Sequence, residues 1–231
     1  MQLKGRLALI SQKVPKCNIV CDVGTDHAYV PIYLLKRGIC EKAIVTDINK
    51  GPIHIAQRNI KEHQLDEFIE TRIGDGLEPL KDSEVDGIII AGMGGKLIER
   101  ILSNGISKAK RAEFLILQPM NSEEIVTSWL YKNKFEIVDE ELVKEDSKIY
   151  NIKTAKWTGK PNKFNEVELY ISNKLINNRN TVLDEYINKK IKMLNNKISG
   201  IKLSKSIEEN DIENYISLRN EMLKILFRGE K

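Results

Sequence analysis

The chain has 231 residues, of which 41% are hydrophobic and 30% charged, and its formal net charge is +4. These values are ordinary for a globular protein, and no stretch approaches the roughly 20 apolar residues that a membrane-spanning helix needs. The N-terminus has no apolar signal-peptide core. Cys17, Cys21 and Cys40 form no C-x-x-C motif and leave an odd count, which argues against disulfides. We therefore expect a cytoplasmic protein that does not bind membranes.

The charge is divided unevenly along the chain. Residues 1–150 hold 21 Lys and Arg against 23 Asp and Glu, a net charge of −2, whereas residues 151–231 hold 16 against 10, a net charge of +6. A basic segment beside a nearly neutral one suggests a polyanionic partner. The alternative is that the Lys-rich helices are simply solvated.

A short amphipathic helix is expected over residues 2–13. Residues 18–23 then form a buried strand that runs into Gly24 and a helix over 28–36. Such a unit opens a nucleotide-binding α/β sheet, which binds ligands beyond the carboxyl ends of its strands. Only Gly24 matches the dinucleotide pattern G-x-G-x-x-G, and Asp26 would repel a pyrophosphate, so the turn suits the cationic S-adenosylmethionine better. The alternative is an ordinary strand, turn and helix of an unrelated α/β protein.

The next two predicted strands also end in acids. Residues 43–48 include Asp47, about 20 residues after the glycine turn, where a nucleotide-binding sheet places a carboxylate on the ribose hydroxyls. Residues 69–73 lead into Asp75 between two glycines, and a carboxylate there can accept a hydrogen bond from the adenine amino group. The alternatives are a solvated Asp47 and a plain turn at Asp75.

The most apolar strand, residues 85–91, belongs at the centre of the sheet. It runs into Gly92-Met93-Gly94-Gly95, and three glycines in four positions imply close approach of the backbone to a ligand. A fifth strand is expected over 114–117. Residues 135–142 and 149–155 then read as two strands joined without a helix, which gives the sheet an antiparallel edge.

Gly159-Lys160-Pro161 is the best domain boundary in the chain, dividing an α/β domain of residues 1–158 from a basic helical domain of residues 159–231. Beyond it, apolar residues recur at coiled-coil spacing and predict two long helices with a turn near 204–209. We therefore expect a C-terminal antiparallel helical coiled coil.

Four motifs occur in a fixed order: Asp22-Val23-Gly24-Thr25-Asp26-His27-Ala28-Tyr29, Gly74-Asp75-Gly76-Leu77, Ala91-Gly92-Met93-Gly94-Gly95 and Ile116-Leu117-Gln118-Pro119. Together they closely resemble the bacterial tRNA (adenine-22-N1)-methyltransferases. The resemblance covers about residues 3–155 in detail, and residues 163–231 match the family's basic coiled coil only in kind. It implies a class I Rossmann-like methyltransferase fold, with a seven-stranded, mostly parallel sheet and an antiparallel edge hairpin. It also implies methyl transfer from S-adenosylmethionine to N1 of an adenine in the tRNA D-arm.

The resemblance further implies which residues surround the cofactor, namely Asp22, Gly24, His27, Asp47, Ile48, Asp75, Gly76, Gly92 and Met93. Common amino-methyltransferases carry an Asn/Asp-Pro-Pro-aromatic turn after the fourth strand. This chain has Ala-Gly-Met-Gly-Gly there, so its base pocket must be built otherwise. We propose no metal, because the three histidines have no metal-ligand spacing.

Neutral adenine offers a lone pair at N1, so alignment with an activated methyl donor can supply most of the catalysis. The product ring is cationic, and a nearby carboxylate would stabilise it. Asp26 is our candidate for that carboxylate, Tyr29 for stacking on the base, and Arg6 for orienting Asp26 or holding a phosphate. The structural alternatives are Asp26 as a helix N-cap, Tyr29 as a core residue and Arg6 as a surface charge.

Because N1 lies on the Watson–Crick edge, the target base must be unpaired or flipped out of its stack. Lys189, Lys190, Lys192 and Lys197 are the predicted contacts to the tRNA backbone. The rival readings are a methyltransferase of another substrate and a non-catalytic RNA-binding scaffold, and the acids at 22, 47 and 75 argue against the scaffold. The expected partner is tRNA, and no obligate protein partner is evident.

Overall fold

The computed structural model describes residues 1–178, 180–203 and 209–227. The chain divides into two compact units, Met1–Asn162 and Lys163–Lys231. The boundary expected from the sequence, after residue 158, lies just before this division. None of the described helices is long and apolar enough to cross a membrane.

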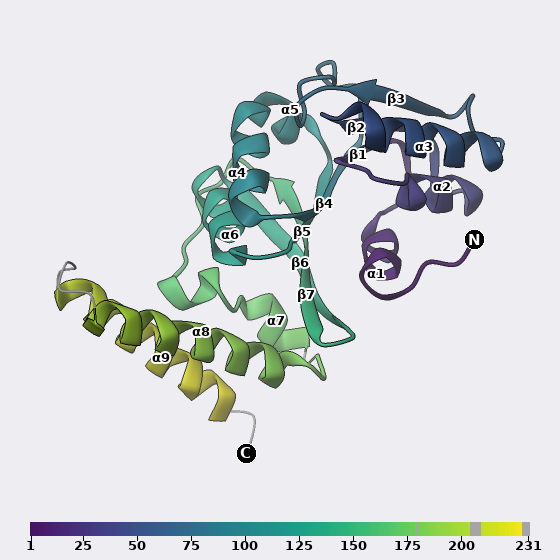
Figure 1. Ribbon diagram of the computed structural model, residues 1–231. Coiled ribbons are helices and arrows are strands. Elements are labelled where there is room, and N and C mark those ends of the chain that lie inside the picture. The colour runs from purple at the N-terminus through teal and green to yellow at the C-terminus, as the bar shows by residue number, and fades with distance from the viewer. Residues whose placement is uncertain (179, 204–208, 228–231) are drawn as a thin grey trace. The chain divides into compact units, whose positions relative to one another are not determined.

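The first unit is built on a seven-stranded sheet with the order β3-β2-β1-β4-β5-β7-β6 (Figure 1). Its strands are β1 Cys17–Val23, β2 Cys40–Asp47, β3 Ile69–Ile73, β4 Gly87–Met93, β5 Phe114–Pro119, β6 Phe135–Glu145 and β7 Lys148–Trp157. The first five strands are parallel to one another, whereas β7 is antiparallel to both β5 and β6. The predicted Rossmann-like sheet with an antiparallel edge is therefore confirmed. Its strand order reverses between β1 and β4, where α/β sheets bind ligands.

The edge hairpin is longer than the sequence suggested. The charged segment 143–148, expected to join the two strands, instead continues the ladder to the pair Glu145↔Lys148. Val143 and Tyr150 on this extension pack against the cluster that includes the first helix, and Glu145 on the same side accepts the backbone N–H of Arg6 in that helix. Local charge therefore misled the prediction of where these strands end.

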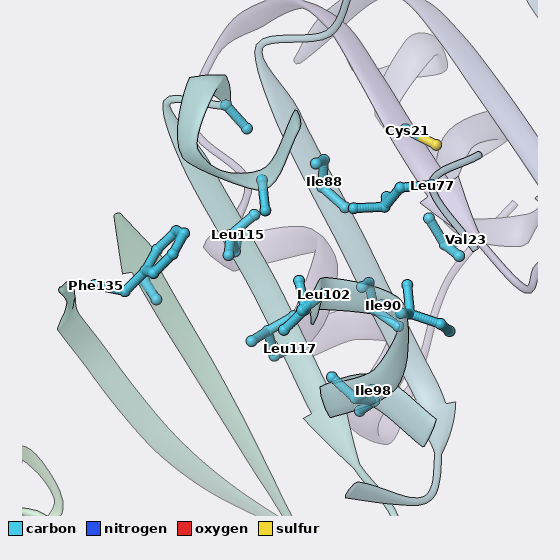
Figure 2. Packing of buried hydrophobic residues seen from close by; sticks show 14 of the residues in the cluster. Cys21, Val23, Leu77, Ile88, Ile90, Ile98, Leu102, Leu115, Leu117 and Phe135 are labelled. Carbon is cyan, nitrogen blue, oxygen red and sulfur yellow. The ribbon is translucent and has the colours of Figure 1, made fainter. Parts of the chain in front are cut away.

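Helices cover both faces of the sheet (Figure 1). One face carries α1 Gly5–Lys13, α2 Tyr29–Lys36 and α3 Lys50–Glu62, and the other α4 Gly95–Asn104, α5 Ile106–Arg111 and α6 Glu123–Lys132. Figure 2 shows the core on the second face, where Ile90 of β4 and Leu117 of β5 pack near Ile98 and Leu102 of α4. These two α4 positions are four residues apart, which places them on one side of the helix. The sequence analysis did not predict the short helix α5.

The second unit contains η1 Glu166–Leu169, α7 Asn173–Asn178, α8 Leu183–Leu203 and α9 Glu209–Phe227. The long helices α8 and α9 pack together through a core that includes Ile187, Leu194, Leu218 and Met222. Both predicted long helices are thus present. Most of the predicted turn at 204–209 lies outside the described residues, and coiled-coil geometry stays a prediction. The short elements η1 and α7 were not predicted, although Asn165 and Glu168 form a capping box around η1.

Candidate active site

Two neighbouring cavities lie at the carboxyl ends of β1, β2 and β4, with volumes of about 430 and 90 Å³. Of the residues predicted to bind the cofactor, the larger cavity is lined by Asp22, Gly24, His27 and Gly92. The smaller cavity is lined by Gly24, Asp47, Ile48, Asp75, Gly76 and Met93. The fold therefore brings all nine residues to one edge of the sheet, with Gly24 shared between the two cavities.

Gly24 has a backbone conformation and a close contact that both favour glycine. Its φ of +71° lies in the left-handed region, and an added Cβ would lie 1.9 Å from Cε of Met93. The Gly24 N–H donates to the carbonyl of Thr46 at 2.7 Å, which ties the turn after β1 to the end of β2. The glycine thus lets Met93 pack directly over the turn where the two cavities meet.

Asp22 is a nearly buried carboxyl, 8% exposed, at the end of β1. Burial raises its pKa from 3.8 to about 7. A hydrogen bond from the Thr25 side chain and the positive charge of Arg6 both lower the pKa, but burial has the larger effect. A group with this pKa is only partly ionised near neutral pH. A cation arriving in the larger cavity would complete its ionisation, so Asp22 suits an ammonium or sulfonium ligand.

His27 and Tyr29 form a stacked pair at the mouth of the larger cavity. Their ring centroids are 4.9 Å apart with planes inclined by 10°, and Tyr29 is 41% exposed. Nε2 of His27 lies 3.2 Å from Oδ2 of Asp26, whose side chain is 67% exposed. The structural alternatives for these residues fail, because Ala28 rather than Asp26 is the N-cap of α2 and Tyr29 lies outside the core. The loop instead presents an aromatic surface and a carboxylate to the cavity.

Arg6 of α1 also lines the larger cavity, but its contacts differ from those expected. Its Nη1 donates to Oε1 of Gln118 at 3.2 Å, and its guanidinium lies 5.8 Å from the centroid of the Tyr150 ring. In the part of the chain that the structure describes, Arg6 makes no hydrogen bond with Asp26, so the structure does not support the first of its two predicted roles, and the second, holding a phosphate, stays a prediction. Arg6 is half-buried rather than a plain surface charge. Sequence reasoning gave Gln118 no role.

The smaller cavity is lined by the two carboxylates that follow β2 and β3, Asp47 and Asp75. Oδ1 of Asp47 accepts the N–H of Asn49 at 2.7 Å, which orients that carboxylate. Asp75 pairs with Nη2 of Arg100 at 3.4 Å. Ile48 is 59% exposed beside Asp47 and offers an apolar surface for a ring. The sequence analysis missed Arg100 and its neighbour Leu97, although their spacing on α4 places both on the side facing this cavity.

The four predicted tRNA-binding lysines do not share one environment. Lys189, Lys192 and Lys197 of α8 are exposed, whereas Lys190 is only 4% exposed and its Nζ lies 4.9 Å from the centroid of the Tyr186 ring. The prediction that Lys190 belongs to an exposed basic surface is therefore wrong. Lys190 follows the buried Ile187 by three residues and so falls on the packed side of the helix.

The described part of the chain offers no group of three or more His, Cys, Asp or Glu side chains that could hold a metal ion. Its three cysteines are free thiols. The two cavities present carboxylates, aromatic rings, backbone groups and two guanidinium groups, those of Arg6 and Arg100.

Comparisons with known proteins point the same way as this geometry. Residues 3–152 match the family model described as a methyltransferase domain. The tRNA (adenine(22)-N(1))-methyltransferase of Bacillus subtilis strain 168 is 39% identical over 155 residues, which span 67% of this chain and 65% of that protein.

Two solved structures resemble nearly the whole chain. The B. subtilis m1A22 tRNA methyltransferase superposes with a TM-score of 0.86 at 28% identity. The superposition covers 97% of this chain and 99% of the B. subtilis chain. The second structure is a putative tRNA (m1A22) methyltransferase of Streptococcus pneumoniae, solved in complex with S-adenosyl-L-methionine. It gives a TM-score of 0.83 at 31% identity, and the superposition covers 96% of this chain and 98% of the S. pneumoniae chain.

Proposed function

This chain belongs to the methyltransferase-domain family, and we propose that it transfers the methyl group of S-adenosylmethionine to N1 of adenine 22 in the D-arm of tRNA. The resemblance seen in the sequence motifs is confirmed by the relatives that bear this activity in their names. The observation that carries the proposal is the pair of cavities at the switch point of the sheet, lined by three carboxylates from successive strand ends.

In this proposal the smaller cavity takes the adenosine of the cofactor. Asp47 accepts hydrogen bonds from the ribose hydroxyls, as acids after the second strand do in nucleotide-binding sheets. Asp75 can accept from the adenine amino group through Oδ2, since Arg100 contacts only Oδ1 of that carboxylate. The exposed side chain of Ile48 packs on the adenine ring. The methionine part then passes Gly24 into the larger cavity, where Asp22 receives its ammonium group.

The larger cavity also takes the target base. Adenine N1 attacks the methyl carbon as the bond from that carbon to sulfur breaks, which leaves neutral S-adenosylhomocysteine and a positively charged methyladenine. The base stacks on the exposed rings of Tyr29 and His27. The Asp26 carboxylate, held by His27 at 3.2 Å, accepts from the N6 amino group and stabilises the developing positive charge. No base catalyst is needed before attack, so alignment supplies most of the rate.

In the same proposal, the helical unit binds the folded tRNA. Lys189, Lys192 and Lys197 are exposed on α8, and residues 163–231 carry a net charge of +3 from 13 basic and 10 acidic residues. Basic side chains that contact phosphates give sequence-independent, salt-dependent affinity. The chain would meet its substrate in the cytoplasm.

The test is methylation of an unmodified tRNA transcript with labelled S-adenosylmethionine, followed by nucleoside analysis. We expect 1-methyladenosine, and none when adenine 22 of the transcript is replaced by guanine. Asp26→Ala should lower the rate by roughly 100-fold or more, as loss of one electrostatic stabiliser does elsewhere, while cofactor affinity persists. Cofactor binding with no methylated tRNA from any transcript would contradict the proposed substrate.

A further inference from the structure

Gln118 is a polar side chain in an otherwise apolar strand. It lies near the end of β5, follows the buried run Phe114–Leu117, and is itself 0% exposed. A buried amide costs free energy unless its polar atoms are hydrogen-bonded. The partners of Gln118 therefore indicate why a glutamine occupies this position.

Both polar atoms of the Gln118 amide, Oε1 and Nε2, make hydrogen bonds. Its Oε1 accepts from Nη1 of Arg6 and from the backbone N–H of Gly92, both at 3.2 Å. Its Nε2 donates to the carbonyl of Pro119 at 2.9 Å and faces Sδ of Met120 at 3.6 Å. Since donors surround the oxygen and acceptors the nitrogen, only one orientation of the amide satisfies all partners.

The hydrogen bond to Gly92 replaces a backbone hydrogen bond that is missing between β4 and β5. The β4–β5 register pairs Ala91 with Gln118 and Met93 with Pro119, so Gly92 is an extra residue in β4. A residue at such a bulge has no backbone hydrogen-bond partner on the neighbouring strand. The φ of +79° at Gly92 also departs from regular strand geometry. Oε1 of Gln118 accepts the hydrogen bond from the Gly92 N–H, which the bulge leaves without a partner on β5. It thereby anchors the backbone that forms one wall of the larger cavity.

The bond to Arg6 places a positive charge beside Gly92 at the same cavity. Gln118 is a neutral acceptor, so it holds the guanidinium without cancelling its charge. Arg6 and Asp22 line the same cavity, and the positive charge of Arg6 favours the ionised form of Asp22. The remaining ionisable groups at this cavity are Asp26, His27 and Tyr29, and Glu145 accepts the backbone N–H of Arg6 at 3.4 Å.

We propose that Gln118 is a positioning residue of this site: its side chain joins Arg6 of α1 to the Gly92 bulge of β4 and keeps the Arg6 charge facing Asp22. The inference rests on the proposed function only for the identity of the cavity's ligand. Gln118 touches neither cofactor nor base in this scheme and acts through the two groups that it holds.

The test is a titration of the Asp22 carboxyl by carbon-13 NMR in the full chain without cofactor, for wild type, Gln118→Met and Gln118→Glu. Methionine keeps the length but offers no hydrogen-bonding oxygen. It releases Arg6, so the midpoint of Asp22 should rise from about 7 to about 8, since an opposite charge nearby typically lowers a carboxyl pKa by 1–3. Affinity for S-adenosylmethionine should then fall about fivefold at pH 7 relative to wild type, with the gap closing by pH 9.

Gln118→Glu keeps both acceptor contacts and loses the contacts of Nε2 with the carbonyl of Pro119 and Sδ of Met120. Its carboxylate neutralises Arg6, so it should still raise the midpoint. Arg6→Met should raise it as much as Gln118→Met, and the double variant no further. Gln57→Met, on the exposed side of α3 where Gln57 donates to Thr71, is the matched control and should leave the midpoint unchanged.

An unchanged midpoint in both Gln118 variants, or additive shifts in the double variant, would overturn the proposal. A chain that binds no S-adenosylmethionine at any pH would instead count against the proposed function, because the titration is made without the cofactor.

Discussion

Replacement of Asp22 by asparagine should separate stability from function. The folded chain holds this carboxyl at a pKa of about 7, against 3.8 when it is solvated. The unfolded chain therefore loses its proton first as pH rises, and wild-type stability falls between pH 4 and pH 7 and then levels off. The difference in pKa corresponds to about 4 kcal/mol at pH 8. The amide of asparagine carries no charge, so the variant should avoid this loss while keeping a similar shape.

The assay is urea and thermal unfolding of both chains from pH 4 to pH 8. At pH 8 we expect Asp22→Asn to be more stable by up to about 4 kcal/mol, or roughly 10 °C in melting temperature, with the gap vanishing near pH 4. Affinity for S-adenosylmethionine should fall about 10- to 100-fold, since a charged hydrogen bond is lost. Asp26→Asn is the matched control, because its 67% exposed side chain has no burial to relieve. A variant less stable than wild type at pH 8 would refute the reasoning.

Three further outcomes follow from the same geometry. Cofactor affinity in wild type should be roughly eightfold weaker at pH 6 than at pH 7.5, because Asp22 must be ionised to bind a cation; equal calorimetric affinities would contradict this. Gly24→Ala should abolish cofactor binding and lower the melting temperature, and adding Met93→Ala should restore stability only in part, because it removes the clash but not the strain of a positive φ. Full binding by the single variant would contradict the assignment. Lys189→Ala should weaken tRNA binding and reduce its salt slope by about 1, whereas Lys190→Ala should lower the unfolding stability and leave the slope alone; a reduced slope for Lys190→Ala would show that this side chain reaches phosphate.

Much of the cofactor site was predictable because it depends on local patterns. Apolar runs such as 18–23 and 43–48 fix which segments become buried parallel strands, and the residue at each carboxyl end must then lie at the same edge of the sheet. Asp22 and Asp47 lie at the ends of such runs and Asp75 follows β3 by two residues, and all three line the two cavities. Their positions needed only the order of the strands.

The partners of individual side chains were decided by the tertiary structure alone. Arg6 and Gln118 are 112 residues apart in the chain, and nothing in either local sequence specifies that they bond. The bulge at Gly92 appears only when β4 is paired with β5, and Lys190 is buried only because its side of α8 faces the core of the helical unit. Periodicity determines which elements form, whereas these contacts depend on how the elements pack, and packing is set by all of their surfaces together.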